Sequence, residues 1–151
     1  MEVLGGRSPF AAHITMIPYQ TKAKKISGTS YGEVFHDALV VLDEIKKKTK
    51  RRPYVRSAYF KKEKIFLDYF REHLFQKRPN ERMKRLRFFK AAVELVKYSR
   101  NEPVAKPNPN KNNEVVYRFA GLTTEKEIFY VQIKEDKKRK RKYFMSCFPP
   151  E

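Results

Sequence analysis

The spacing of apolar residues changes along this chain, and that change constrains the fold more than any other feature. Before residue 100, apolar side chains recur every three or four residues, as on one face of a helix; after residue 113 they alternate with polar ones, as on a strand. Residues 101–113, in between, hold three prolines and five asparagines, which disfavour both patterns. The sequence therefore predicts helices, then a linker, then a sheet.

Three helices are predicted in the first part of the chain, over residues 31–48, 61–76 and 80–100. The third is expected to begin at Asn80, a residue type that commonly caps helices. The apolar stripes of the three helices are, in order, Val34, Ala38, Val41, Leu42 and Ile45; Ile65, Phe66, Tyr69, Phe70 and Leu74; and Met83, Leu86, Phe89, Ala92, Val93 and Val96. We expect these stripes to form the core.

Three strands are predicted in the last part, over residues 114–120, 128–134 and 143–148, joined as an antiparallel meander. Helices followed by hairpin-connected strands indicate an α+β fold, with N-terminal helices packed on a C-terminal antiparallel sheet of at least three strands. A length of 151 residues suits one domain. We expect residues 1–30 to be an N-terminal segment that can be partly extended. Residues 31–151 are then a single domain with helices over 31–100, a linker over 101–113 and the sheet over 114–149.

The charge indicates a polyanionic partner. The chain has 35 lysines and arginines against 17 acidic residues, and residues 46–100 alone carry 20 basic and 5 acidic side chains. Such an excess is typical of nucleic-acid binding, with a membrane surface as the second choice. We expect nucleic acid, RNA rather than DNA, and no membrane. The basic residues predicted to contact it are Arg56, Arg82, Arg85, Arg87, Lys90, Lys138, Arg139, Lys140 and Arg141.

Several other chemistries are disfavoured by the residues available. The single cysteine, Cys147, cannot form an internal disulfide, and His13, His36 and His73 lie far apart, so no metal site is expected. No glycine-rich phosphate loop is present, and no cofactor is predicted. The N-terminal residues have no long apolar run, so a cytoplasmic location is expected. His36 or His73 could still reach a site on the sheet as a general acid or base.

One face of the predicted sheet is not needed for the core. In residues 128–134 the odd positions are apolar and should pack on the helices, whereas the even positions face away. If Lys134 pairs with Lys142 and residue 118 with Tyr130, that open face gathers cations and aromatic rings. Cations with rings can hold phosphates and stack unpaired bases, or stabilise the transition state of phosphate chemistry. The residues on this face are Arg118, Tyr130, Gln132, Lys134, Phe144, Ser146 and Phe148.

Several of these segments resemble a known family. Residues 117–121 (Tyr-Arg-Phe-Ala-Gly), 129–134 (Phe-Tyr-Val-Gln-Ile-Lys) and 143–149 (Tyr-Phe-Met-Ser-Cys-Phe-Pro) resemble the sheet half of small nucleases of the barnase/EndoU/colicin/RelE superfamily. The likeness is to the variety found in phages and mobile elements. Residues 52–60 and 85–89 are similar to motifs of bacterial proteins that end in the same sheet. The likeness covers about residues 50–150.

The resemblance implies RNA cleavage on the sheet face without a metal. No histidine follows His73, which departs from the barnase pattern and favours the RelE-like version. In that version Arg118 and Lys134 neutralise the phosphate and Ser146 hydrogen-bonds it. Tyr117 or Tyr143 assists proton transfer, although strand alternation favours core positions for both tyrosines. Gln132 completes the predicted catalytic set.

Three functions follow as hypotheses. The first is a metal-independent endoribonuclease, either a toxin or a mobile-element protein. The second is a non-catalytic RNA- or DNA-binding protein, which the charge supports equally well. The third is a mobile-element protein that binds a partner, its charge serving an acidic antitoxin or inhibitor.

Overall fold

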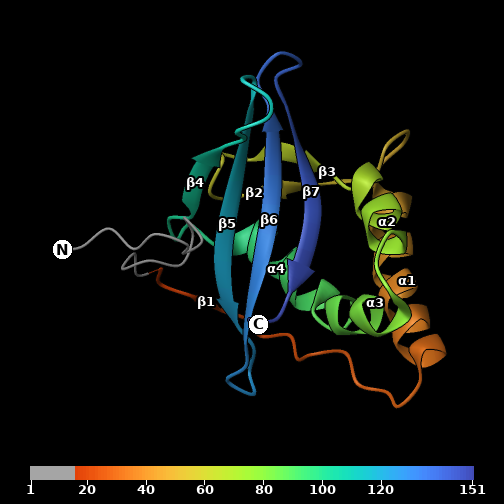
Figure 1. The fold of residues 1–151 in the computed structure, drawn as a ribbon. Coiled ribbons are helices and arrows are strands. Elements are labelled where there is room, and N and C mark those ends of the chain that lie inside the picture. The colour runs from red at the N-terminus through yellow and green to blue at the C-terminus, as the bar shows by residue number, and fades with distance from the viewer. Residues whose placement is uncertain (1–15) are drawn as a thin grey trace.

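The computed structural model describes residues 16–151, and within that range the chain forms four helices and seven strands (Figure 1). In chain order the elements are β1 (Tyr19–Gln20), α1 (Tyr31–Lys48), β2 (Tyr54–Ser57), β3 (Glu63–Phe66), α2 (Asp68–Phe75), α3 (Pro79–Leu86), α4 (Phe89–Tyr98), β4 (Val104–Pro107), β5 (Glu114–Leu122), β6 (Ile128–Asp136) and β7 (Arg141–Phe148). The strands form one sheet in the order β1-β5-β6-β7-β3-β2, with β4 pairing β5. Of the predicted N-terminal segment, residues 1–15 lie outside the described residues, and residues 19–20 form β1.

The predicted fold class is wrong. The expected meander β5-β6-β7 is present, but the sheet is mixed rather than antiparallel, because β1 pairs with β5 and β3 with β7 in parallel. Four of its strands precede residue 114, and helices alternate with strands along the chain instead of coming first. Long-range pairing of short strands, which local periodicity does not report, accounts for the difference.

Strand β3, which forms a hairpin with β2, replaces the first part of the predicted helix over residues 61–76. Val55 and Ser57 are buried on β2 and Ile65 on β3, so both strands alternate with period two. Ile65 then pairs opposite Lys142 of β7, which adds the hairpin to the sheet. Only residues 68–75 of the predicted helix are helical, as α2.

The predicted third helix is two helices, α3 and α4, with a break at Arg87 and Phe88. The break lets neighbouring aromatic rings face different partners: Phe88 stacks on Phe129 of β6, and Phe89 stacks on Phe70 of α2. In one continuous helix the side chains of adjacent residues would point only about 100° apart, and the break allows a larger separation. The helix begins at Pro79 after Arg78, so the expected Asn80 cap is also wrong.

Helix α1 has the predicted bounds, and Ser30 caps it by accepting a hydrogen bond from the backbone N–H of Glu33 at 3.3 Å. The predicted linker is partly ordered as β4, which lies on the edge of the sheet and pairs with β5. Pro107 is tolerated there because an edge strand need not donate every backbone N–H. Within residues 16–151, no helix combines the length and the apolar character needed to cross a membrane.

The core lies between one face of the sheet and helices α1, α2 and α4. Figure 1 shows α4 behind strands β5, β6 and β7. Gly121 of β5 leaves no room for a side chain, because a Cβ there would lie 2.3 Å from Phe129 Cζ and 2.8 Å from Leu95 Cδ1. Both of those side chains are buried and cannot move into solvent.

We predict that Gly121→Ala destabilises the protein by about 1–3 kcal/mol, because the added methyl overpacks the core. Gly32→Ala in α1 is the matched control, since a Cβ there meets nothing closer than 3.9 Å. That substitution should leave stability unchanged or raise it by up to about 1 kcal/mol, since alanine favours helix. Urea unfolding measures both. Equal stability of Gly121→Ala and wild type would contradict the packing described.

Candidate functional site

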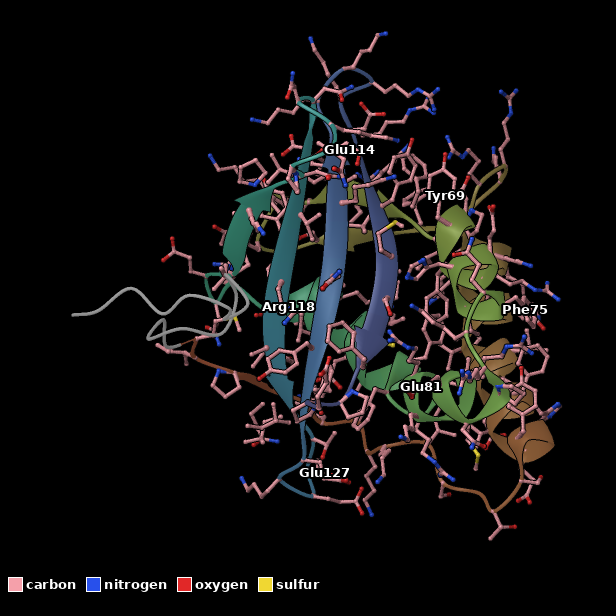
Figure 2. The ribbon with its side chains drawn as sticks, in the orientation of Figure 1. Tyr69, Phe75, Glu81, Glu114, Arg118 and Glu127 are labelled. Atoms are coloured by element: carbon pink, nitrogen blue, oxygen red, sulfur yellow. The ribbon has the colours of Figure 1, made fainter. Side chains whose placement is uncertain are left out.

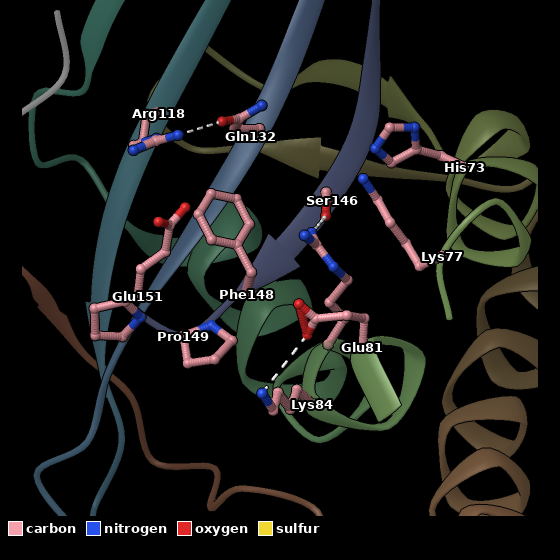
Figure 3. A pocket seen from close by; sticks show the side chains of 12 residues that line it. His73, Lys77, Glu81, Lys84, Arg118, Gln132, Ser146, Phe148, Pro149 and Glu151 are labelled. Atoms are coloured by element: carbon pink, nitrogen blue, oxygen red, sulfur yellow. Dashed lines mark hydrogen bonds and ion pairs between the residues drawn. The ribbon is translucent and has the colours of Figure 1, made fainter. Parts of the chain in front are cut away.

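A pocket of about 510 Å³ lies between the open face of the sheet and the connection from α2 to α3 (Figure 3). Figure 3 shows Arg118 and Gln132 on the sheet side, His73 and Lys77 on the helix side, and Ser146 and Phe148 between them. The residues that line it are Arg118, Gln132, Ser146, Phe148, Pro149, Pro150 and Glu151 of the sheet and the segment after it, and His73, Lys77, Glu81, Lys84 and Arg85 of the helical side.

The pocket forms along the part of β7 that has a neighbouring strand, β6, on one edge only. β3 pairs with Lys142 and Tyr143 only, so the second half of β7 faces α2 and α3. Arg85 of α3 ties the two parts together: its Nη1 donates to Ser146 Oγ at 2.6 Å, and its carbonyl accepts from Cys147 Sγ at 3.2 Å. Ser146 is only 3% exposed, so this contact is held within the packed structure.

A bulge decides which β7 side chains reach the pocket. Lys134 pairs with Tyr143, not with Lys142 as predicted, and the register then shifts between Ile133 and Gln132. Gln132 therefore lies opposite Ser146, which joins the open face as expected. Phe144, predicted on that face, pairs with Ile133 and is buried in the core instead, because β7 has one residue more than β6 at this point.

Arg118 is held in place by three groups of the open face. Its Nη2 donates to Gln132 Oε1 at 2.7 Å, and its Cζ lies 5.0 Å from the Phe148 ring centroid and 5.5 Å from that of Tyr130. Arg118 pairs with Gln132, not with Tyr130 as predicted, but the face is the same. Burial lowers the pKa of Arg118, while Tyr130 and Glu151 oppose that change. The guanidinium stays charged at neutral pH.

Arg85 and Arg118 share one aromatic ring. The Arg85 Cζ lies 5.2 Å from the Phe148 ring centroid, close to the 5.0 Å of Arg118. The buried Nε of Arg85 has no hydrogen-bond partner among residues 16–151. Guanidinium groups fixed by packing in this way are suited to bind a phosphate or carboxylate, because little side-chain entropy remains to be lost.

His73 brings a group that can accept a proton into the same pocket. Burial lowers its pKa, and the positive charges of Lys77, Arg85 and Lys134 lower it further. The imidazole is therefore mostly neutral at pH 7, and one of its nitrogens has a free lone pair. A neutral imidazole that lines the same pocket as two arginines combines a proton acceptor with a site for negative charge.

Three of the six predicted catalytic residues, Arg118, Gln132 and Ser146, line the pocket. Lys134 does not: its Nζ lies 3.6 Å from Glu114 Oε2, and Figure 2 shows Glu114 near one end of the sheet and Arg118 about midway. Tyr117 lies on the core face and donates to Glu135 Oε1 at 2.6 Å, and both burial and this contact raise its pKa.

Tyr143 also lies away from the pocket. It is buried, and its ring packs 4.7 Å from that of Tyr69 and 6.2 Å from that of Phe66. Strand alternation anticipated that Tyr117 belongs to the core. Tyr143 is buried for a different reason. It pairs with Lys134 and so lies on the open face of the sheet, where Phe66 of β3 and Tyr69 of α2 cover its ring.

The predicted nucleic-acid contacts are dispersed. Arg82 donates to the carbonyls of Lys77 and Phe75, and Arg87 donates to those of Ile26 and Gly28, so both hold backbone segments together. Arg85 faces the pocket, while Lys90 is exposed outside it and Arg56 lies on β2. Lys138, Arg139, Lys140 and Arg141 are exposed at the turn from β6 to β7.

Sequence reasoning missed the helical side of the pocket, apart from Arg85 as a general RNA contact and His73 as an alternative acid or base. Lys77, Glu81 and Lys84 were not predicted for the site. A weak signal was available: Glu81 and Arg85 are four residues apart and share one face of α3. Lys77 lies just after the end of α2, outside any such pattern. Glu81 Oε2 lies 3.8 Å from Lys84 Nζ at the rim.

Within residues 16–151, no three His, Cys, Asp or Glu side chains are gathered in a way that could hold a metal ion. Comparisons of the chain with protein-family models, curated proteins and solved structures gave no match.

We predict that His73 titrates below its ordinary pKa of 6.5, because it is buried and surrounded by cations. Lys77→Ala should raise its pKa toward 6.5 by removing one repulsive charge, whereas Lys90→Ala, outside the pocket, should leave it unchanged. NMR titration of the imidazole protons measures all three proteins. A His73 pKa at or above 6.5 in the wild type would contradict the arrangement described.

Proposed function

We propose that this protein is a metal-independent endoribonuclease whose active site is the pocket between the sheet and the α2–α3 connection. The observation that carries the proposal is the juxtaposition of Arg85 and Arg118 around Phe148 with His73, whose pKa is lowered, in the same pocket. The sequence resemblance to barnase/EndoU/colicin/RelE nucleases supports an endoribonuclease, although it favoured a RelE-like site without histidine and the base proposed here is His73. A role as a toxin or mobile-element protein is part of this proposal.

In the proposed reaction, His73 removes the proton of a ribose 2′-hydroxyl, and the 2′-oxygen attacks the adjacent phosphorus. The bond from phosphorus to the 5′-oxygen breaks, and that oxygen leaves with a proton from water. The products are a 2′,3′-cyclic phosphate and a 5′-hydroxyl end. Arg85 and Arg118 stabilise the negative charge that grows on the phosphoryl oxygens. DNA has no 2′-hydroxyl, so RNA is the substrate that this chemistry requires.

Ser146 and Gln132 act through the two arginines. Ser146 Oγ accepts from Arg85 and Gln132 Oε1 accepts from Arg118, so each arginine keeps a fixed direction in the pocket. They are positioning residues in this proposal. Phe148 provides an apolar surface beside both guanidinium groups, on which a base could also stack.

A second candidate function is non-catalytic RNA binding. It is favoured by the number of exposed basic side chains away from the pocket, including the turn from β6 to β7. In that case Arg85 and Arg118 would hold a phosphate without reaction, and His73 would be only a neighbour. Binding without cleavage distinguishes this function from the first.

We predict that the purified protein cleaves single-stranded RNA in EDTA and leaves cyclic phosphate ends. Arg118→Ala should lower kcat/KM by about 100-fold or more, because a lost transition-state donor costs on the order of 3 kcal/mol. His73→Ala should lower it by about 100- to 10,000-fold, the usual contribution of a general base. Arg51→Ala removes an exposed positive charge outside the pocket and is the matched control. RNA that is bound but stays intact would favour the second function.

The pH dependence of cleavage gives a separate test of the role of His73. If His73 is the base, kcat/KM should rise with pH as the imidazole loses its proton, with a midpoint below 6.5, because its pKa is lowered. Lys77→Ala should move that midpoint upward. A rate that does not change between pH 5 and 8 would exclude His73 as the base while leaving the arginines in place.

A further inference from the structure

A second basic hollow, of about 1040 Å³, lies between the turn from β2 to β3 and the end of α4. Five cations line it, Arg56, Lys61, Lys62, Lys97 and Arg100, together with two tyrosines. We call this surface the basic groove. It is distinct from the pocket, with which it shares no residue.

The basic groove and the pocket lie on opposite sides of the sheet. Tyr59, which lines the groove, packs edge to face on Phe119 at 5.6 Å, and Phe119 is buried on the core face. Arg118, the next residue along β5, points to the open face and the pocket. A nucleotide bound in the basic groove therefore cannot also contact the pocket.

The cations of the basic groove are not neutralised within the protein. Among residues 16–151, none of the five forms an ion pair, and no carboxylate lines the groove. Other basic residues are paired: Lys142 binds Glu63 at 2.8 Å, and Lys25 binds Glu127 at 2.8 Å. Five unpaired cations around one hollow attract a polyanion and repel one another in its absence.

The backbone that presents two of these lysines is strained. Lys61 and Lys62 have φ values of 55° and 66°, in the left-handed region that favours glycine. The turn is over-determined by hydrogen bonds: Lys62 N–H donates to the Ser57 carbonyl at 2.6 Å, and Arg56 Nη1 donates to the Lys62 carbonyl at 3.0 Å. These hydrogen bonds fix the turn and hold both lysine side chains at the edge of the groove.

An exposed aromatic ring completes the groove. Tyr98, in the last turn of α4, is 63% exposed, so its ring is accessible to a ligand. A ring flanked by lysines and arginines is the arrangement on which single-stranded nucleic acids stack their bases while their phosphates bind the cations. An acidic protein segment would use the cations but not the ring.

We propose that the basic groove is a second binding site for single-stranded RNA, with phosphates on Lys61, Lys62 and Arg100 and a base stacked on Tyr98. The proposal deepens the proposed function, because the substrate would then be held on both sides of the sheet. It names RNA as the ligand, and an acidic polypeptide is an outcome of the test. Binding at the groove needs no reaction at the pocket.

The positive φ angles give a sharp test. Lys61→Gly/Lys62→Gly removes two charges and relieves strain, so the variant should melt at the same or a higher temperature than the wild type. Its affinity for an oligouridylate should fall, and the slope of log affinity against log salt should fall by about 1.4, since each lost phosphate contact in single strands contributes about 0.7. Lys126→Gly is the control, because Lys126 also has a positive φ, of 66°, but lies in another turn. It should keep the wild-type salt slope.

The ring is tested separately. Tyr98→Ala should weaken oligouridylate binding about 5- to 100-fold, because stacking on an aromatic side chain contributes about that much per base, whereas Tyr98→Phe should bind as the wild type does. Poly-glutamate of the same length should bind Tyr98→Ala and wild type equally.

Two results would overturn the proposal: an oligouridylate affinity of Lys61→Gly/Lys62→Gly equal to that of Lys126→Gly, or tighter binding of poly-glutamate than of oligouridylate. Cleavage by the wild type in those same assays would leave the proposed function standing. Loss of binding in the groove variant, with no cleavage by any protein, would support the groove and reject the endoribonuclease.

Discussion

The short pairing of β3 with β7 is the constraint on which the site depends. Because β3 pairs with β7 at Lys142 and Tyr143 only, the rest of β7 has no strand on that edge. α2 and α3 cover the edge with aromatic packing, in which Phe70 lies 5.1 Å from Phe144, and with the bond from Arg85 to Ser146. A longer β3 would occupy this edge and exclude the helices. The helical wall of the pocket therefore exists because one strand is short.

Positive charge is divided between structural and accessible roles. Arg82 and Arg87 bind backbone carbonyls, and Lys142 is buried with Glu63 and Glu135, so these cations stabilise the fold. The cations of the pocket and of the basic groove line hollows in the surface. The net charge of +18 is therefore larger than the positive charge that a ligand can contact. The position of each cation in the fold decides whether a ligand can reach it.

Local pattern predicted the parts of the fold that depend on local energy. Helix α1 and the strands β5, β6 and β7 follow their apolar periodicities, and the places of Arg118 and Gln132 on the open face followed from alternation. Ser146 lies on that face because of the bulge in β7, which alternation did not predict. The β2–β3 hairpin and the break at Arg87 and Phe88 were not predicted, because each is decided by packing against distant residues. The place of His73 in the pocket was not predicted for the same reason, since packing over a long sequence distance sets α2 beside β7.

The bulge in β7 divides that strand into two halves with opposite assignments of its side chains. Before it, Phe144 is inward; after it, Ser146 and Phe148 face the pocket while Cys147 is buried. In a regular strand Phe144 and Ser146 would lie on the same face of the sheet, because side chains alternate with period two. Here the extra residue reverses the alternation, so that one strand presents Phe144 to the core and Ser146 to the pocket.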